Sequence, residues 1–324
     1  MNRSFAFAYY LFFISSFAVA QTEEPMHYKI TVPAGAELTL DGTLAIPNNL
    51  KKAVPVVLLI AGSGPTDRDC NSPYGLKSNS FKMLSDSLVS KGIAVARYDK
   101  RGSGNNIQAA TKNLKSEDHR FDFYVSDAVG FIRQLQADKR FSYLIVAGHS
   151  EGSLVGMLAA EQTKAKGYIS IAGPGRNIAD VLKAQGRAGG NPKDIQAEVD
   201  SALDSLRDGH TVHPRNPLLQ AQLPLKAQMG FISWMKYDPA AVIKKYGGNV
   251  LIIQGKKDLQ VAVADAELLK AARPDAKLVL FDTMNHILKD VDGLDPKENF
   301  KTYNNPELPI TPGLATTIAQ FVKQ

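Results

Sequence analysis

Apolar runs alternate with amphipathic segments along most of this sequence, starting near residue 54. Residues 54–61, 93–98 and 143–147 are short, mainly apolar runs, a pattern that predicts strands buried on both faces of a sheet. Residues 80–90 and 121–136 repeat their apolar positions with a helical period. Strands that alternate with helices predict an α/β protein whose mostly parallel sheet is flanked by helices.

The alternation continues on both sides of these segments. Residues 27–32 and 37–46 alternate polar and apolar positions around Pro33-Ala34-Gly35, which predicts an antiparallel hairpin leading into the sheet. Further strands are expected at residues 167–172, 249–254 and 277–281, and further helices at residues 150–164, 263–272 and 314–322.

The strand pattern stops between residues 176 and 247. This segment has helical stretches at residues 194–206 and 218–229, separated by Gly-Gly, Asn-Pro and His-Pro breakers. It falls between the sixth and seventh expected strands, so it would cover the carboxyl edge of the sheet, where open α/β folds bind ligands. We therefore expect a helical cap at residues 176–247, inserted into a core domain formed by residues 21–175 and 248–324.

The first twenty residues have the composition of a secretory signal peptide. Arg3 is followed by a mostly apolar stretch at residues 5–17 and by Ala18-Val19-Ala20, which resembles a cleavage site. The stretch is short for a membrane span, although an uncleaved anchor is the alternative, and no cysteine follows to carry a lipid. We expect cleavage after Ala20 and export to the periplasm or the medium, without stable membrane insertion.

Composition and charge narrow the function classes. The chain has 324 residues, is 44% hydrophobic and 22% charged, and is long enough for one large α/β domain with an insertion. Its net charge of +6 is spread along the sequence, so no basic stripe indicates nucleic-acid binding. The single cysteine, Cys70, excludes an intramolecular disulfide, and the absence of a histidine near it in sequence argues against a cysteine nucleophile.

The pentapeptide Gly148-His149-Ser150-Glu151-Gly152 joins the strand expected at residues 143–147 to the helix that follows. In a G-x-S-x-G turn the glycines leave room for a sharp bend, which projects the serine hydroxyl outward as a nucleophile. The pattern alone is weak, because a glycine-rich turn with an exposed serine would also produce it. Its position between a strand and a helix favours Ser150 as the nucleophile.

A serine nucleophile needs a general base, and the base needs an orienting partner. His286 and Asp258 each follow an expected strand, so both would lie at the same carboxyl edge as Ser150. The other histidines, which lie in the hairpin, before a helix, in the turn and in the cap segment, are His27, His119, His149, His210 and His213. The competing acids, which lie in a helix, in a turn or too near His286 in sequence, are Asp265, Asp275 and Asp282.

An oxyanion intermediate needs two backbone N–H donors, and the residue after the nucleophile, Glu151, supplies the first by position. The glycine-rich loop after residues 54–61 would supply the second from Ser63, or alternatively from Gly62 or Gly64. A phosphate-binding loop is a weaker interpretation, because no Gly-Lys-Ser or Gly-Lys-Thr follows. This chemistry requires no cofactor and no metal.

Five motifs occur in order: Ala61-Gly62-Ser63-Gly64-Pro65-Thr66-Asp67-Arg68-Asp69, Arg97-Tyr98-Asp99-Lys100-Arg101-Gly102-Ser103-Gly104, the pentapeptide around Ser150, Gln254-Gly255-Lys256-Lys257-Asp258 and Asn285-His286. Together they resemble those of bacterial α/β-hydrolases of the carboxylesterase-like serine hydrolase kind, over nearly the whole mature chain. The resemblance implies an eight-stranded sheet, acyl transfer and catalytic Ser150, Asp258 and His286. It also implies that the turn after Asp99 braces the loops around the site.

We therefore expect a serine hydrolase that cleaves small carboxylic esters through an acyl-enzyme intermediate. A serine peptidase of the aminopeptidase kind, with the same triad, is the alternative, and a catalytically inactive binding module with this fold is a third interpretation. The cap segment, which would select the substrate, carries no motif that the resemblance can interpret, and the sequence has no feature that sets the oligomeric state.

Overall fold

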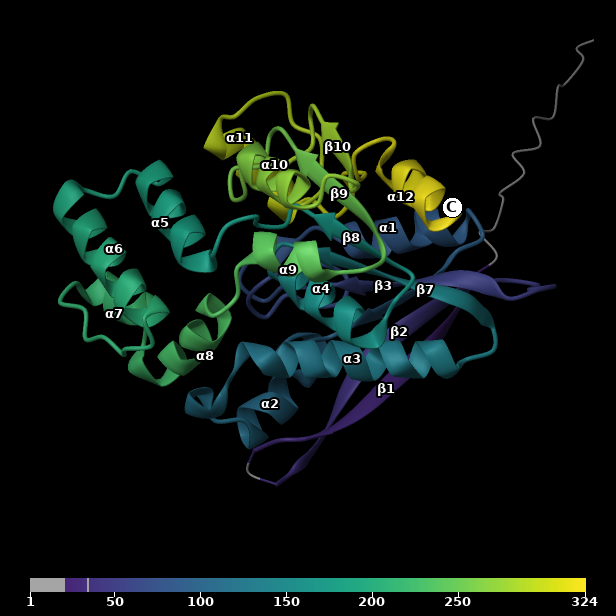
Figure 1. The fold of residues 1–324 in the computed structure, drawn as a ribbon, viewed down its shortest axis with the longest axis horizontal. Helices are drawn as coiled ribbons and strands as arrows, with labels where there is room; N and C mark the ends of the chain where they lie inside the picture. Colours follow the sequence, from purple (N-terminus) through teal and green to yellow (C-terminus); the bar gives the residue numbers. More distant parts are fainter. Residues whose placement is uncertain (1–20, 34) are drawn as a thin grey trace, which may run out of the picture.

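The computed structural model describes residues 21–33 and 35–324, so the signal peptide expected at residues 1–20 lies outside the described residues. One large sheet forms the centre of the described chain (Figure 1). Its eight strands lie in the order β1-β2-β6-β3-β7-β8-β9-β10. They are β1 (Gln21–Thr31), β2 (Glu37–Pro47), β3 (Val54–Ile60), β6 (Ala94–Tyr98), β7 (Phe141–His149), β8 (Gly167–Ile171), β9 (Asn249–Gly255) and β10 (Lys277–Phe281).

The strand pairing confirms the expected mostly parallel sheet. The six neighbouring strands β6, β3, β7, β8, β9 and β10 pair in parallel. Parallel pairing requires a crossover connection, usually a helix, that returns the chain to the end of the sheet at which the strands begin. The β1–β2 hairpin is antiparallel and joins the sheet through antiparallel pairing of β2 with β6. A small separate hairpin is formed by β4 (Asn71–Ser72) and β5 (Leu76–Lys77).

Helices cover both faces of the sheet and bury a hydrophobic core on each. One face carries α3 (Phe121–Ala137), α4 (Glu151–Thr163), α9 (Pro239–Lys245) and α10 (Val263–Ala272), and the other carries α1 (Ser80–Val89) and α12 (Leu314–Val322) (Figure 1). In β3, Val56 and Leu58 pack in the first core, whereas Val57 and Leu59 pack in the second. Burial on both faces explains why the strand has no polar alternation.

The segment between β8 and β9 forms the helical insertion. Its helices α5 (Ile178–Ala188), α6 (Lys193–Arg207), α7 (Pro217–Gln222) and α8 (Leu225–Met235) gather at one end of the molecule (Figure 1). They bury a cluster of their own, which includes Ile178, Leu203 and Leu219. The last helix before β9, α9, differs: its Ile243 is buried in the core of the sheet, so the cap proper consists of α5–α8.

The helix expected at residues 218–229 is wrong as a single element. Two helices, α7 and α8, meet at Leu223-Pro224, because Pro224 has no backbone N–H and cannot continue the first helix. The pattern also missed the short helices α2 (Ile107–Asn113) and α11 (Pro296–Lys301). Along residues 21–33 and 35–324, no helix has both the length and the apolar character that a membrane crossing requires.

Candidate active site

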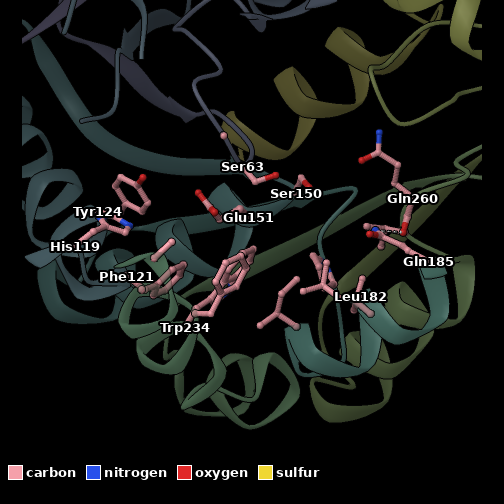
Figure 2. A pocket seen from close by; sticks show the side chains of 18 residues that line it. Ser63, His119, Phe121, Tyr124, Ser150, Glu151, Leu182, Gln185, Trp234 and Gln260 are labelled. Atoms are coloured by element: carbon pink, nitrogen blue, oxygen red, sulfur yellow. Dashed lines mark hydrogen bonds between the residues drawn. The ribbon is translucent and has the colours of Figure 1, made fainter. Parts of the chain in front are cut away.

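Ser150 lies at the turn between β7 and α4, in a strained backbone conformation. Its φ of 54° and ψ of −121° are rare for a residue with a side chain. A Cβ at Gly148 would overlap the backbone of Gly152, and a Cβ at Gly152 would overlap the carbonyl oxygen of Ile60. Glycine is therefore required at both ends of the turn, and the tight turn directs the serine side chain toward the cavity beneath the cap (Figure 2).

The structure brings Asp258 and His286 into contact. His286 Nδ1 lies 2.8 Å from Asp258 Oδ2, and both side chains are buried. The carboxylate also accepts hydrogen bonds from the backbone N–H groups of Gln260, at 2.8 Å, and Val261, at 2.9 Å. Burial alone would raise the pKa of Asp258, but His286 and these donors outweigh it and hold the pKa below its ordinary value. The ionised carboxylate of Asp258 therefore orients the His286 ring by contacting Nδ1. The second ring nitrogen, Nε2, does not contact this carboxylate.

His149, the residue before Ser150 in the chain, contacts His286. Its ring centroid lies 4.7 Å from that of His286, and its Nε2 donates to the backbone carbonyl oxygen of His286 over 2.7 Å. Among the hydrogen bonds of the described residues, none joins Ser150 Oγ to His286 directly. Burial lowers the pKa of His149 to about 3, so this ring is neutral and acts as a fixed donor.

The glycine-rich loop after β3 borders the same cavity as Ser150. Ser63, Gly64 and Glu151 line this cavity, whereas Gly62 does not. In the described part of the chain, the backbone N–H groups of Ser63 and Glu151 have no protein acceptor. That of Glu151 belongs to the first turn of α4, where N–H groups are free of intrahelical bonds. Both donors are available to an oxyanion.

The charged residues after β3 and β6 form ion pairs that brace these loops, as the resemblance implies. Arg68 pairs with Asp99 over 2.6 Å, and Arg101 pairs with Asp127 over 2.6 Å. Lys100 Nζ is buried between the Gly62 carbonyl oxygen and the Glu151 carboxylate. Each pair connects a loop at the carboxyl edge of the sheet to a neighbouring element.

A cavity of about 340 Å³ lies between the core and the cap, with Ser150 in its wall (Figure 2). The core contributes His119, Phe121 and Tyr124, and the cap contributes apolar residues of α5 and α8, among them Leu182 and Trp234. The sequence interpretation set His119 aside because it only precedes a helix, and it missed the aromatic residues of the cavity. No local pattern distinguishes these positions from core positions of an amphipathic helix.

Cys70 is not part of this site. Cys70 is buried and does not line the cavity, and burial raises the pKa of its thiol far above the usual range. In the part of the chain that the structure describes, no cluster of His, Cys, Asp and Glu side chains is arranged to hold a metal ion.

The doubly covered parallel sheet and the strained serine between β7 and α4 define an α/β-hydrolase, as the motifs imply. A family model described as serine aminopeptidase, S33, matches residues 74–290, and the chain belongs to that family.

Comparisons with individual proteins find both esterases and peptidases. Esterase EstD from Thermotoga maritima is 31% identical over 260 residues, which span 78% of this chain and 59% of the length of EstD. Est1E from Butyrivibrio proteoclasticus, solved with ferulic acid bound, superposes with a TM-score of 0.54 at 17% identity, covering 88% of this chain and 93% of Est1E. An acylaminoacyl peptidase from Pyrococcus horikoshii has a TM-score of 0.54 at 16% identity, covering 94% of this chain and 42% of its own. The two structural similarities establish a shared fold.

Proposed function

We propose that this chain is a serine esterase that hydrolyses small carboxylic esters. The observation that carries the proposal is the buried Asp258–His286 pair, 2.8 Å apart, at the same edge of the sheet as the strained Ser150. Ser150 attacks the acyl carbonyl, His286 takes its proton and passes it to the leaving alcohol, and Asp258 stabilises the imidazolium. Water then repeats these steps on the acyl-enzyme.

The backbone N–H groups of Ser63 and Glu151 stabilise the negative oxygen that forms in both steps. They are free of protein acceptors in the described chain and border the cavity that holds Ser150. Donors that are fixed before reaction stabilise the developing charge without reorganisation. The positive end of α4, which begins at Glu151, adds to the same stabilisation.

The charge of the cavity supports an esterase over an aminopeptidase. Among the residues that the structure describes, Glu151 is the only acid that lines the cavity, and its carboxylate is paired with Lys100 over 2.9 Å. An acid near the nucleophile would bind the ammonium group of an aminopeptidase substrate through charge-assisted hydrogen bonds, and the Lys100 pair already occupies the Glu151 carboxylate. The 31% identity to EstD, an esterase, points the same way. The proposal includes export after cleavage at Ala20, which the composition of residues 1–20 supports.

Turnover of p-nitrophenyl acetate and of aminoacyl p-nitroanilides by the purified chain tests this function. We expect ester hydrolysis to exceed anilide hydrolysis, and Ser150→Ala to abolish it together with labelling by a fluorophosphonate probe. A strong preference for anilides would contradict the esterase proposal, and equal labelling of wild type and Ser150→Ala would contradict the assignment of the nucleophile.

A further inference from the structure

The cavity has two sides of different chemistry, with Ser150 between them (Figure 2). One side is aromatic and is formed by His119, Phe121, Tyr124 and Trp234. The other side carries two amides, Gln185 from the cap and Gln260 from the loop after β9. Gln185 Nε2 donates to the backbone carbonyl oxygen of Gln260 over 2.9 Å, so this contact joins cap and core.

The four rings of the aromatic side carry no charge at neutral pH. The Phe121 and Trp234 rings stack with an interplanar angle of 4° and a centroid distance of 5.5 Å. Burial lowers the pKa of His119 and raises the pKa of Tyr124, so both rings are neutral. This side favours an apolar substrate group and disfavours a charged one.

The amide side is directly connected to the proposed acid–base pair. The backbone N–H of Gln260 donates to Asp258, which in turn holds His286. A general acid must reach the leaving oxygen, so the alcohol portion of an ester has to lie on the side of His286. The acyl portion then extends in the opposite direction from Ser150, toward the aromatic rings.

We propose that the aromatic side binds the acyl group and that the amide side binds the alcohol. The substrates are therefore esters that join an apolar, preferentially aromatic, carboxylic acid to a small polar alcohol. This inference rests on the proposed esterase function and adds which half of the substrate each side recognises.

Two ester series test the assignment. In one, the alcohol is methanol and the acyl group changes from acetyl to benzoyl and 3-phenylpropionyl; in the other, the acyl group is benzoyl and the alcohol changes from methanol to glycerol and benzyl alcohol. We expect Trp234→Ala to lower kcat/KM for the aromatic acyl groups about 10-fold relative to acetyl, without changing the order of the alcohols. Gln185→Leu should reduce the preference for glycerol over benzyl alcohol instead.

The opposite result, in which Trp234→Ala changes alcohol preference and Gln185→Leu changes acyl preference, would overturn the assignment while leaving the esterase function intact. Should Trp234→Ala fold poorly, Trp234→Phe and Gln185→Leu give the same comparison. Absence of turnover by the wild type in both series would contradict the esterase function itself.

A second, independent observation concerns Lys100, which lies two residues after the end of β6 at Tyr98. Its side chain is only 1% exposed, and Nζ donates to both the Gly62 carbonyl oxygen and the Glu151 carboxylate, the latter over 2.9 Å. The C=O of Gly62 and the N–H of Ser63 belong to one trans peptide unit and point in opposite directions. Holding the carbonyl at Lys100 therefore directs the Ser63 N–H away from Lys100.

We infer that Lys100 is a positioning residue that holds both proposed oxyanion donors at once. Through Gly62 it fixes the orientation of the Ser63 N–H, and through the carboxylate it fixes Glu151, whose own N–H is the second donor. Without the lysine, the peptide between Gly62 and Ser63 can rotate and turn a carbonyl oxygen toward the oxyanion. Such a rotation replaces a donor by an acceptor where negative charge develops.

The test compares Lys100→Met with a matched control, Asp127→Asn, which disrupts the neighbouring buried Arg101–Asp127 pair. We expect Lys100→Met to lower kcat about 100-fold with little change in KM, and to weaken binding of a boronic acid transition-state analogue by a similar factor. Asp127→Asn loosens the same turn without removing the contacts to Gly62 and Glu151, so it should lower stability comparably but lower kcat and the affinity for the analogue much less. If both variants lose kcat equally and in proportion to their lost stability, Lys100 has only a structural role and the inference is wrong.

Discussion

His149 Nε2 donates a hydrogen bond to the backbone carbonyl oxygen of His286 over 2.7 Å. A carbonyl oxygen only accepts, so the hydrogen of the neutral ring lies on Nε2, and Nδ1 is buried without a protein partner in the described chain. The residue before the proposed nucleophile thus holds the backbone of the proposed base. This hydrogen bond connects the turn at Ser150 to the loop that carries His286.

The first prediction concerns the pH dependence of stability that His149 causes. Burial lowers its pKa from 6.5 to about 3 in the folded protein, so the unfolded chain binds the proton first as the pH falls. Stability that is fully present above the unfolded value is therefore lost as the pH falls toward the folded value. His149 alone should lower the free energy of unfolding by about 2 kcal/mol between about pH 7.5 and about pH 5.

Urea unfolding of wild type and His149→Gln at these two pH values measures this contribution. Glutamine keeps an N–H donor but does not titrate, so the loss of unfolding free energy on acidification should be about 2 kcal/mol smaller in the variant. Comparing the two proteins cancels the carboxylates, which titrate in both. An identical pH dependence would show that burial does not lower the pKa of His149 in the folded protein.

The second prediction concerns Asp258→Asn. We expect kcat for esters to fall roughly 10⁴-fold with KM nearly unchanged, because the amide neither holds the productive tautomer of His286 nor stabilises its charged form. Asp282→Asn is the matched control, because Asp282 directly follows β10, is exposed and pairs at the surface with Lys256, which follows β9 as Asp258 does. Activity similar to wild type in Asp258→Asn would exclude Asp258 as the orienting acid.

The third prediction concerns the contact that fixes the start of the cap. The carboxylate of Asp265, fully buried in α10, accepts hydrogen bonds from the Gly175 N–H at 3.1 Å and from the Arg176 guanidinium at 2.6 Å. Asp265→Ala leaves these donors unsatisfied, so we expect about 3 kcal/mol lower free energy of unfolding and a higher KM.

Asp275→Ala is the control for this variant, because Asp275 is exposed and pairs with Arg273 just after α10 ends. Its loss should lower the free energy of unfolding far less than the loss of Asp265 does, because the exposed pair is screened by solvent, and should leave KM unchanged. Urea unfolding and ester kinetics on both variants make the comparison. Similar costs for the two variants would mean that the buried contact does not hold the cap.

The fourth prediction concerns Cys70. Its thiol is buried and its pKa is raised by burial, so the reactive thiolate is rare at neutral pH. Ellman's reagent should detect no thiol in the native protein and one after denaturation in guanidinium chloride. Rapid labelling of the native protein, with loss of esterase activity, would show that the Cys70 thiol is accessible and reactive.

The elements of the sheet were predictable because the evidence for each is local. A strand covered on both faces is a continuous apolar run, as in β3 and β7, and each helix on the sheet has an apolar stripe. The contact between Asp258 and His286 followed from their positions after β9 and β10, since parallel strands end at one edge.

The remaining features depend on contacts between distant parts of the chain. His119 borders the cavity because it packs against α8, where a Cβ added to Gly230 would lie 2.9 Å from its ring. The Phe121 N–H donates to Ser233 of the same cap helix over 2.7 Å. Neither contact leaves a trace in the local sequence. The break at Pro224 was missed because the apolar positions continue with a helical period across it.

The cap leaves the sheet after β8, and the chain returns through α9 to the adjacent strand, β9. The inserted helices α5–α8 supply none of the three proposed catalytic residues, Ser150, Asp258 and His286. Mutations in α5–α8 can therefore accumulate under selection for new substrates while the reaction itself is inherited unchanged. Substrate specificity can therefore change through the cap before the catalytic reaction changes.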